Sequence, residues 1–269
     1  MSAQKVELER DEGIATIRLS NAPTHTLTAA GVLEMHRILD DLENDSGLRV
    51  LVLTGGGEGV FVAHYEVGEL ADQSEQSQGA NDAGAQGGGD LHAMHRLCLR
   101  LEALSAPTVA ALNGSAAGGG FELALACDFR LAADGDFVFG LPETSVGIIP
   151  GAGGTQRMAR MIGTARALDL ILHARLLRPG EAHELDLIHR LVPADRFADA
   201  VAGFTRDLAS RAPVALAAAK RAIHEGAALP MEAALSVEQE QFGRAMRSKD
   251  AAGAMRAWLK GETWDWTGE

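Results

Sequence analysis

The stretch Asn113–Glu122, with the sequence NGSAAGGGFE, lies between two apolar runs. The run before it, Thr108–Leu112, predicts a buried strand that ends at the Asn113-Gly114 turn. The run after it, Phe121–Ala126, predicts a short helix. Three consecutive glycines between the runs let backbone N–H groups approach a ligand closely, and a helix that begins there adds its positive end. This stretch therefore predicts a strand, a turn and a helix around a hole that can hold negative charge.

A second glutamate follows a similar turn. It is Glu143, at the end of Phe139–Glu143 (FGLPE), and the glycine-rich segment Pro150–Arg157 comes shortly after it. Acidic residues are common near helix N-termini because of the helix dipole alone, so either Glu122 or Glu143 by itself would be interpreted as structural. Because both accompany glycine- or proline-bearing turns, we interpret them as an acid and a base. Such a pair can move protons beside a carbonyl whose negative charge is stabilised.

Around these stretches the chain alternates strands and helices and then turns helical. Alternating apolar and polar residues over Val6–Arg10 and Gly13–Leu19 predict a hairpin. From Thr155 onward the periodicity is almost entirely helical. We therefore predict an α/β fold, with a wound core over residues 1–195 and a helical region over residues 196–269. Apolar spacing predicts the remaining core elements, which are helices over Thr28–Asn44 and Asp90–Leu104 and strands over Val50–Leu53, Phe129–Ala132 and Phe137–Phe139.

The composition is that of a globular enzyme and excludes some classes of partner. The 269 residues are 46% hydrophobic and 23% charged, and the formal net charge is -13. So acidic a chain lacks the basic surface that general nucleic-acid binding needs. No apolar stretch is long enough to predict a membrane span, and no signal or transit peptide is visible. Cys98 and Cys127 have no partner spacing, so we expect free thiols in a cytoplasmic protein.

Three other patterns have plain interpretations. Ala71–Gly89 is rich in Gly, Gln, Ser, Asp and Asn, which predicts a mobile surface loop, with a lid over a ligand as a second interpretation. Gly151–Gly154 and Gly55–Gly59 suggest dinucleotide-binding loops, but neither has the required glycine spacing and strand–helix context. We expect Gly151–Gly154 to shape either a ligand pocket or a helix entry instead. His92 and His95 lie three residues apart, but without a third ligand nearby they do not predict a metal site.

Three segments carry a family resemblance: Val109–Gly114, Gly118–Asp128 and Phe139–Arg157. Together they resemble the enoyl-CoA hydratase/isomerase (crotonase) superfamily, and the likeness runs from the first hairpin to the last helix. It implies a superhelix of repeated β-β-α turns with a helical C-terminal region that makes trimers or hexamers. It also implies an acyl-CoA thioester as the partner. Coenzyme A is then part of the substrate, and no metal or redox cofactor is expected.

The resemblance also assigns residues to the site. It implies that the backbone N–H groups of Tyr65 and Gly119 hold the thioester oxygen beside the catalytic Glu122 and Glu143. Near the C-terminus, an aromatic and a basic residue of the last helix are implied to reach the coenzyme A of a neighbouring subunit. The residues implied to bind substrate are Ala63, His64, Glu66, Val67, Gly118, Leu141, Gly151, Trp258 and Lys260.

The segment His64-Tyr65-Glu66 departs from the family pattern, because relatives usually carry Gly-Ala-Asp there. A backbone N–H does not depend on its own side chain, so the predicted hole can survive. A left-handed backbone at the first position would, however, strain His64. Relatives often place a lysine shortly afterwards for the coenzyme A phosphates, where this chain has Gly68-Glu69.

In carrying both glutamates, this chain resembles the hydratases of the family. We predict syn addition of water across a trans-2-enoyl-CoA, in which Glu122 takes a proton from water and Glu143 supplies one to the α-carbon. Two rivals share the fold: an enoyl-CoA isomerase, and a β-dicarbonyl or thioester hydrolase that uses His64 and Tyr65. A third rival is a catalytically silent acyl-CoA-binding or scaffold homologue.

Overall fold

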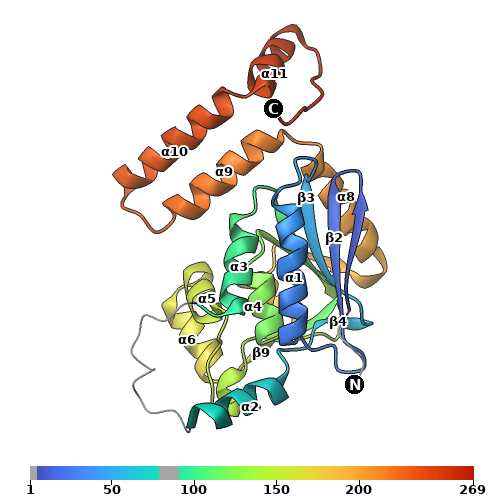
Figure 1. The fold of residues 1–269 in the computed structure, drawn as a ribbon, viewed down its shortest axis with the longest axis vertical. Helices are drawn as coiled ribbons and strands as arrows, with labels where there is room; N and C mark the ends of the chain where they lie inside the picture. Colours follow the sequence, from blue (N-terminus) through green and yellow to red (C-terminus); the bar gives the residue numbers. More distant parts are fainter. Residues whose placement is uncertain (1–4, 79–90) are drawn as a thin grey trace.

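Two sheets organise the computed structural model, which describes residues 5–78 and 91–269 (Figure 1). The larger sheet has the order β1-β2-β3-β5-β7-β10, with an antiparallel first pair and parallel pairs elsewhere. The smaller sheet has the order β4-β6-β8-β9. The strands are β1 (Lys5–Asp11), β2 (Ile14–Ser20), β3 (Val50–Gly55), β4 (Gly59–Val62), β5 (Thr108–Leu112), β6 (Gly114–Ala117), β7 (Phe129–Asp134), β8 (Phe139–Gly140), β9 (Leu176–Leu177) and β10 (Arg190–Pro193).

The helices begin largely where the sequence predicts. Thr28 caps the first one, because its hydroxyl oxygen accepts the N–H of Gly31 at 3.1 Å. Within the described residues, no helix is both long and apolar enough to cross a membrane. The helices are α1 (Ala29–Leu42), α2 (Val67–Gln78), α3 (Ala93–Ala103), α4 (Gly119–Leu125), η2 (Glu143–Val146), α5 (Gly154–Ile162), α6 (Thr164–Leu172), α7 (Pro179–Glu184), η3 (Ala194–Arg196), α8 (Phe197–Ala209), α9 (Pro213–Gly226), α10 (Met231–Met246) and α11 (Lys249–Lys260).

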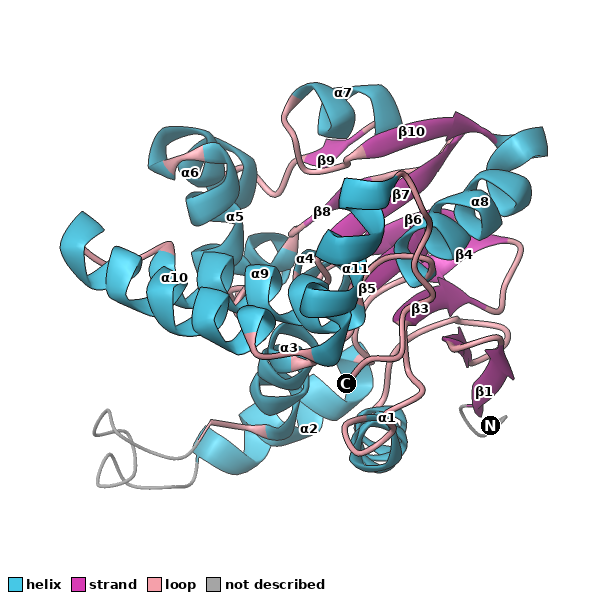
Figure 2. Ribbon diagram, turned by 90° about the horizontal axis from the view of Figure 1, so that it is seen from above, coloured by secondary structure: helices cyan, strands magenta, loops and turns pink. Residues whose placement is uncertain are grey.

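The larger sheet is covered on both faces, and strand β3 shows how. Leu51 and Leu53 belong to the main core with α1, α3 and α4, whereas Val50 and Val52 pack in a second cluster with α8. Figure 2 shows α8 and α1 on different sides of the strands. Successive side chains of a strand point to opposite faces. A strand buried on both faces is therefore apolar throughout, which explains the continuous runs in the sequence.

Two expectations about local structure are corrected. The predicted surface loop over 71–89 is wrong in its first part, because residues 67–78 form α2, and residues 79–89 lie outside the described residues. No residue of α2 is buried. A helix with no buried face needs no apolar stripe, so its sequence carries no helical signal. The chain after Thr155 is also not helical throughout: β9 pairs with β8, and β10 extends the larger sheet beside β7. Strands this short contain too few residues to show a period of two.

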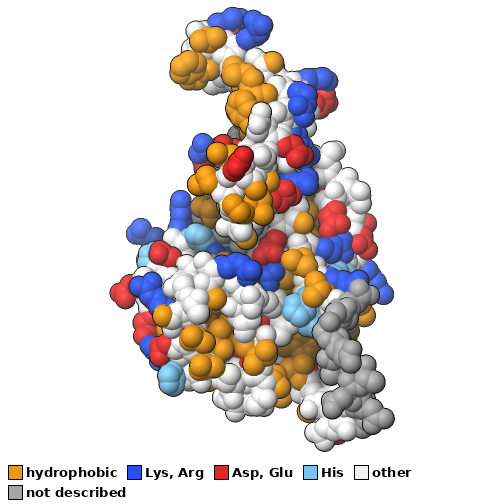
Figure 3. Space-filling view, turned by 90° about the vertical axis from the view of Figure 1, so that its left-hand side faces the viewer, with side chains coloured by type: hydrophobic (Ala, Val, Ile, Leu, Met, Phe, Trp, Pro, Cys, Tyr) orange, Lys and Arg blue, Asp and Glu red, His pale blue; other side chains and the backbone are white. Residues whose placement is uncertain are grey.

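The last helices extend from the core to one end of the molecule (Figure 1). Hydrophobic side chains gather on the surface of that end (Figure 3), and on α11 they include Met255, Trp258 and Leu259. The chain after α11 folds back onto this helix. Buried Asp250 accepts hydrogen bonds from the Trp264 indole at 3.0 Å and the Gly268 N–H at 2.7 Å. A division of the chain near residue 195 stays a prediction.

Candidate active site

A cavity of about 630 Å³ lies where α1, α2, α3 and α4 meet the loops after β4 and β8. Its lining is mostly apolar, with a few polar groups that converge on one side, as is usual for small-molecule sites. The four predicted catalytic and oxyanion residues, Tyr65, Gly119, Glu122 and Glu143, all line it. The predicted substrate-binding residues that join them are His64, Val67, Gly118 and Gly151.

The backbone amides of Tyr65 and Gly119 lie side by side at this cavity. A Cβ atom placed on Gly119 would be 3.6 Å from the Tyr65 nitrogen. Among the described residues, neither amide donates to a backbone acceptor. Gly119 is the first residue of α4, where an N–H has no partner within the helix. Two amides that face a cavity without acceptors form the kind of hole that stabilises an oxyanion.

Hydrogen bonds to two neighbouring segments hold the Tyr65 amide in place. The backbone of Leu27 runs beside it: its N–H donates to His64 O and its carbonyl accepts from Glu66 N, both at 2.8 Å. The carbonyl of Ala63 accepts the N–H of Ala117 at 3.1 Å, two residues before Gly119. The two loops of the predicted hole are therefore tied directly to each other.

His64 shows none of the strain that its position raised as a concern. It is absent from the described non-glycine residues with positive φ, which include His25 with φ 51. Its Nδ1 lies 2.7 Å from its neighbour's carbonyl, Tyr65 O. The replacement of the usual family glycine by histidine is thus compatible with this backbone.

Gly118 is needed as a glycine for two reasons. Its φ of 50 with ψ of -131 suits only a residue without a Cβ. A Cβ there would also lie 3.1 Å from Glu143 Oε1. The glycine turn therefore brings the backbone against the second carboxyl group.

Glu122 is buried in the first turn of the glycine-led helix α4, with only 2% of its surface exposed. Its Oε1 accepts the N–H groups of Ala152 and Gly154, each at 2.7 Å. Burial raises the pKa of Glu122, while these two N–H groups and the charge of Arg157 oppose the rise. One carboxylate oxygen is thus fixed by the backbone.

Glu143 sits in a different environment. Its Oε2 is buried and has no hydrogen-bond partner among the described residues. Burial raises the pKa of Glu143 from 4.5 to about 7, and the charge of Glu122 adds to the rise. A carboxyl group with a pKa near neutrality can both give and take a proton at physiological pH. The two glutamates therefore lie in different environments, which is the arrangement that an acid–base pair requires.

The Tyr65 hydroxyl is engaged outside this pair. Burial raises its pKa, and a hydrogen bond to Glu69 with the charge of that carboxylate raises it further. Glu69 Oε2 also accepts the N–H of Ala29 at 2.8 Å, at the start of α1. Glu69 therefore joins α2 to α1 and also bonds the Tyr65 hydroxyl, while the Tyr65 backbone amide lies at the hole.

Five residues expected to bind substrate do not line the cavity of this chain. Ala63 and Glu66 belong to the hydrogen-bonded segments that hold the Tyr65 amide. The Thr26 hydroxyl donates to Glu66 Oε2 at 2.8 Å. Leu141 is fully buried and lies against Gly154. Trp258 and Lys260 are on α11, where the Trp258 residue is 78% exposed. An adjoining subunit would be needed for the last two residues to meet a substrate.

Sequence reasoning missed much of the apolar wall. A run of aliphatic residues, Val146–Pro150, follows the second glutamate, and three of its side chains line the cavity. The position of this run beside Glu143 was a signal that could have identified it. The missed lining residues include Val32, Leu33, Leu70, Gln73, His92, Met94, Val146, Ile148 and Ile149.

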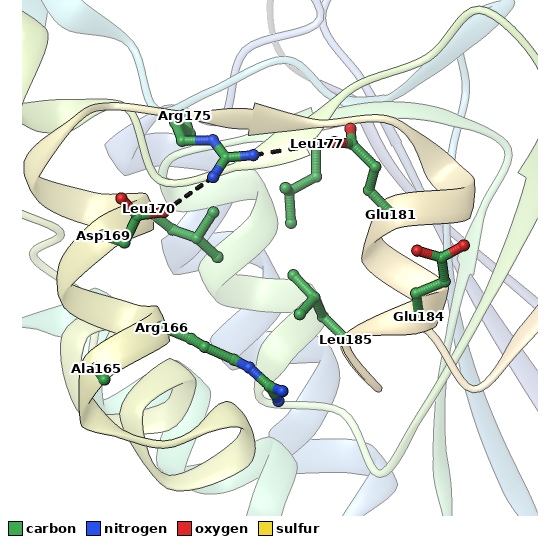
Figure 4. Close-up of a pocket in the computed structure, with 9 residues that line it drawn as sticks. All are labelled: Ala165, Arg166, Asp169, Leu170, Arg175, Leu177, Glu181, Glu184 and Leu185. Carbon is green, nitrogen blue, oxygen red and sulfur yellow. Dashed lines mark hydrogen bonds and ion pairs between the residues drawn. The ribbon is translucent and has the colours of Figure 1, made fainter.

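A second cavity, of about 520 Å³, lies between α6, β9 and α7 (Figure 4). Figure 4 shows Arg175 between two carboxylates, Asp169 at 2.9 Å and Glu181 at 3.9 Å. Arg166 and Glu184 also line it. None of the residues that line it comes from the glycine turns, so we assign the chemistry to the first cavity.

The fold and this first cavity define an α/β enzyme of the crotonase type, and comparisons identify its family. The family described as enoyl-CoA hydratase/isomerase matches residues 9–269. The short-chain-enoyl-CoA hydratase of Clostridium acetobutylicum is 33% identical over 261 residues, which are 97% of this chain and 96% of the relative. The crotonyl-CoA hydratase of Syntrophomonas wolfei is 31% identical over 97% of this chain and 96% of its own.

A solved structure agrees with the sequence relatives. The enoyl-CoA hydratase from Bacillus anthracis has a TM-score of 0.88 and 31% identity, and the match covers 98% of this chain and 99% of that one. The chain therefore belongs to the enoyl-CoA hydratase/isomerase family.

Proposed function

We propose that this protein hydrates trans-2-enoyl-CoA thioesters. One observation carries the proposal: Glu122 and Glu143 both line an apolar cavity that also contains the amides of Tyr65 and Gly119. Two relatives named as hydratases, of short-chain enoyl-CoA and of crotonyl-CoA, support it. Coenzyme A enters as part of the substrate, and the reaction needs no other cofactor.

The geometry suits each step of this reaction. The thioester oxygen binds to the two amides, which stabilise the enolate that forms as water attacks the β-carbon. One such donor contributes roughly 3–4 kcal/mol. Glu122, whose oxygen is held by two N–H groups, accepts a proton from the water. Glu143, whose pKa is raised to about 7, donates a proton to the α-carbon. Hydration thus uses both carboxyl groups in one addition.

The hydrolase rival requires a working hydroxyl or imidazole beside the hole. The Tyr65 hydroxyl is bonded to Glu69 and its pKa is raised, which disfavours it as a nucleophile or base. His64 Nδ1 is occupied by a backbone carbonyl. These contacts favour hydration over hydrolysis. An isomerase differs from a hydratase in its substrate, a 3-enoyl-CoA, so assays with both substrates tell the two apart.

We further propose that Trp258 and Lys260 act across a subunit boundary in a trimer or hexamer. Both lie on α11, and exposed hydrophobic side chains surround them, among them Met255 and Leu259. An apolar surface of this kind marks a protein interface. A charged ammonium group at its edge could pair with a coenzyme A phosphate of the adjoining subunit.

The test follows crotonyl-CoA with the purified protein. Hydration removes the conjugated enoyl-thioester absorbance without releasing a thiol, and Glu122→Gln should abolish it. Glu184→Gln, at a carboxyl of the second cavity, is the matched control and should keep wild-type turnover. Release of free coenzyme A would establish the hydrolase, and conversion of a 3-enoyl-CoA alone would establish the isomerase. Binding of crotonyl-CoA without any turnover would favour the scaffold homologue.

A further inference from the structure

Helix α3 holds the loop after Pro150 through two side chains. His92, which precedes its first turn, places Nε2 at 2.6 Å from the carbonyl oxygen of Gly151. Glu102, near the other end of the helix, binds Arg157 through two hydrogen bonds of 2.7 and 3.0 Å. Arg157 in turn donates to the carbonyl of Ala152 at 2.8 Å. Two consecutive carbonyl groups of this loop are therefore held from the same helix.

The opposite side of the loop contacts a catalytic carboxylate. The N–H of Ala152 donates to Glu122 Oε1 at 2.7 Å. This N–H and the Gly151 carbonyl belong to the same peptide group, which is planar and rigid. His92 therefore binds one end of the peptide group and Glu122 binds the other. A turn of His92 or loss of its contact would rotate the plane that orients the carboxylate.

Apart from the Arg157 contact and the buried Ala152 methyl group, the loop itself offers little that fixes this plane. Gly151 has no side chain and is exposed, and a Cβ placed there would meet only Ile149 O, at 3.9 Å. Gly153, two residues later, has φ 99. Glycines leave the unbound loop free to adopt many conformations. Contacts from outside the loop must therefore select the conformation that presents the Ala152 N–H.

We propose that His92 is a positioning residue for Glu122, acting through the Gly151–Ala152 peptide group. A donor at Nε2 polarises the carbonyl and strengthens the N–H at the far end of the same group, because hydrogen bonds in a chain reinforce one another. This positioning role adds to the proposed hydration. It rests on that proposal in one respect, the assignment of Glu122 as the base. Because the contact itself is independent of the reaction, it can be measured without turnover.

Several other charged or titratable groups influence Glu122 and must stay constant in the test. Arg157 of α5 lies near it, and the charge of His92 itself acts in the same direction. Glu143 of η2 and the buried thiol of Cys98 on α3 also interact with it. The His95 ring lies beside that of His92, tilted by 42°, with ring centroids 3.9 Å apart. The variants below leave Arg157, Glu143, Cys98 and His95 unchanged. Both variants remove the charge of His92, so the comparison between alanine and glutamine isolates the hydrogen bond.

The experiment compares His92→Ala with His92→Gln. A glutamine amide can reach the Gly151 carbonyl with an N–H donor, whereas alanine cannot. Alanine should lower kcat for crotonyl-CoA about ten-fold, the low end of what one hydrogen bond to a charged group contributes, and should leave KM within about two-fold. Glutamine should restore most of kcat. His173→Ala, at an exposed histidine of the α6 C-terminus, is the control.

Two kinetic results would overturn the proposal. One is an unchanged kcat in His92→Ala. The other is a rise in KM as large as the fall in kcat that glutamine does not rescue, since this would mean that His92 contacts the substrate directly. Folding should survive both substitutions, because His92 is exposed and makes no side-chain cap to its helix.

A second readout separates this inference from hydration itself. Carbon-13 labelled glutamate reports the titration of the Glu122 carboxyl group by NMR, with Glu122→Gln to assign the signal. Loss of the fixed N–H should move the Glu122 titration to higher pH in His92→Ala, because that hydrogen bond favours the ionised form. Most of this change should be absent in His92→Gln. An unmoved titration in His92→Ala would refute the positioning role, whether or not the wild type hydrates crotonyl-CoA.

Discussion

Replacing Glu143 by glutamine should abolish activity and yet stabilise the protein at alkaline pH. Burial raises the pKa of Glu143 from 4.5 to about 7, and its Oε2 has no partner among the described residues. The amide of glutamine has nearly the same shape but cannot donate an acid proton. Loss of a general acid lowers kcat by about 10²–10⁴-fold. Because the oxyanion amides are untouched, KM should change little.

The sign of the stability effect follows from the raised pKa. Below pH 4.5 the carboxyl is protonated in both folded and unfolded chains, so it costs nothing. As the pH rises from 4.5 toward 7, this carboxyl group ionises in the unfolded chain but stays protonated in the folded one, so the folded protein loses stability. The full difference corresponds to an upper limit of about 3 kcal/mol, which solvent screening at the cavity reduces to about 1–2 kcal/mol. Glutamine, neutral throughout, avoids this loss.

Thermal unfolding of the wild type and Glu143→Gln at pH 5 and pH 8 measures this directly. The two proteins should have similar Tm values at pH 5, and the variant should be higher by a few degrees at pH 8. Turnover of crotonyl-CoA is measured on the same samples, with Glu184→Gln as the control for both. A variant that is inactive and also less stable at pH 8 would refute the assignment of Glu143 as a buried, unpartnered acid.

Three further outcomes are expected. Tyr65→Phe removes the hydrogen bond to Glu69 but keeps the backbone amide, so kcat for hydration should stay within about three-fold, and a complete loss would instead favour the hydrolase. Asp250→Asn should lower Tm at pH 7, because the hydrogen bonds of the folded-back chain hold the pKa of Asp250 at about 2. This stability is present above the ordinary value near 4 and is lost as the pH falls toward 2, so the two proteins should converge in acid; a Tm difference independent of pH would contradict this. Cys98 and Cys127 are buried with pKa values raised to about 12, so the native protein should resist thiol alkylation at pH 8 that the unfolded protein accepts, and fast labelling of the native protein would show that the core opens.

Much of the fold followed from local pattern. The hairpin of β1 and β2, the Thr28 cap of α1 and the buried runs of β3 and β5 all lie where spacing predicted them. Each depends on residues close in sequence, or on a strand whose two buried faces make it apolar throughout. The helix α2 and the strand β10 were missed for the opposite reason. An exposed helix without an apolar stripe shows no helical periodicity in its sequence, and a four-residue strand is too short to show alternation. Whether these segments form a helix or a strand therefore depends on the elements they contact in the fold.

The sequence by itself determined the family, the glycine turn and the two glutamates. It could do so because a short run of glycines permits a tight turn and a close backbone approach wherever it occurs, and because the two carboxyl groups follow glycine- or proline-bearing turns. Only the tertiary structure decided what surrounds each carboxyl. The two N–H groups on Glu122 come from 30 and 32 residues further along the chain, and His92 reaches Gly151 across 59 residues. The pKa of a group depends on its burial and on neighbours in space, which are set only when distant segments pack together.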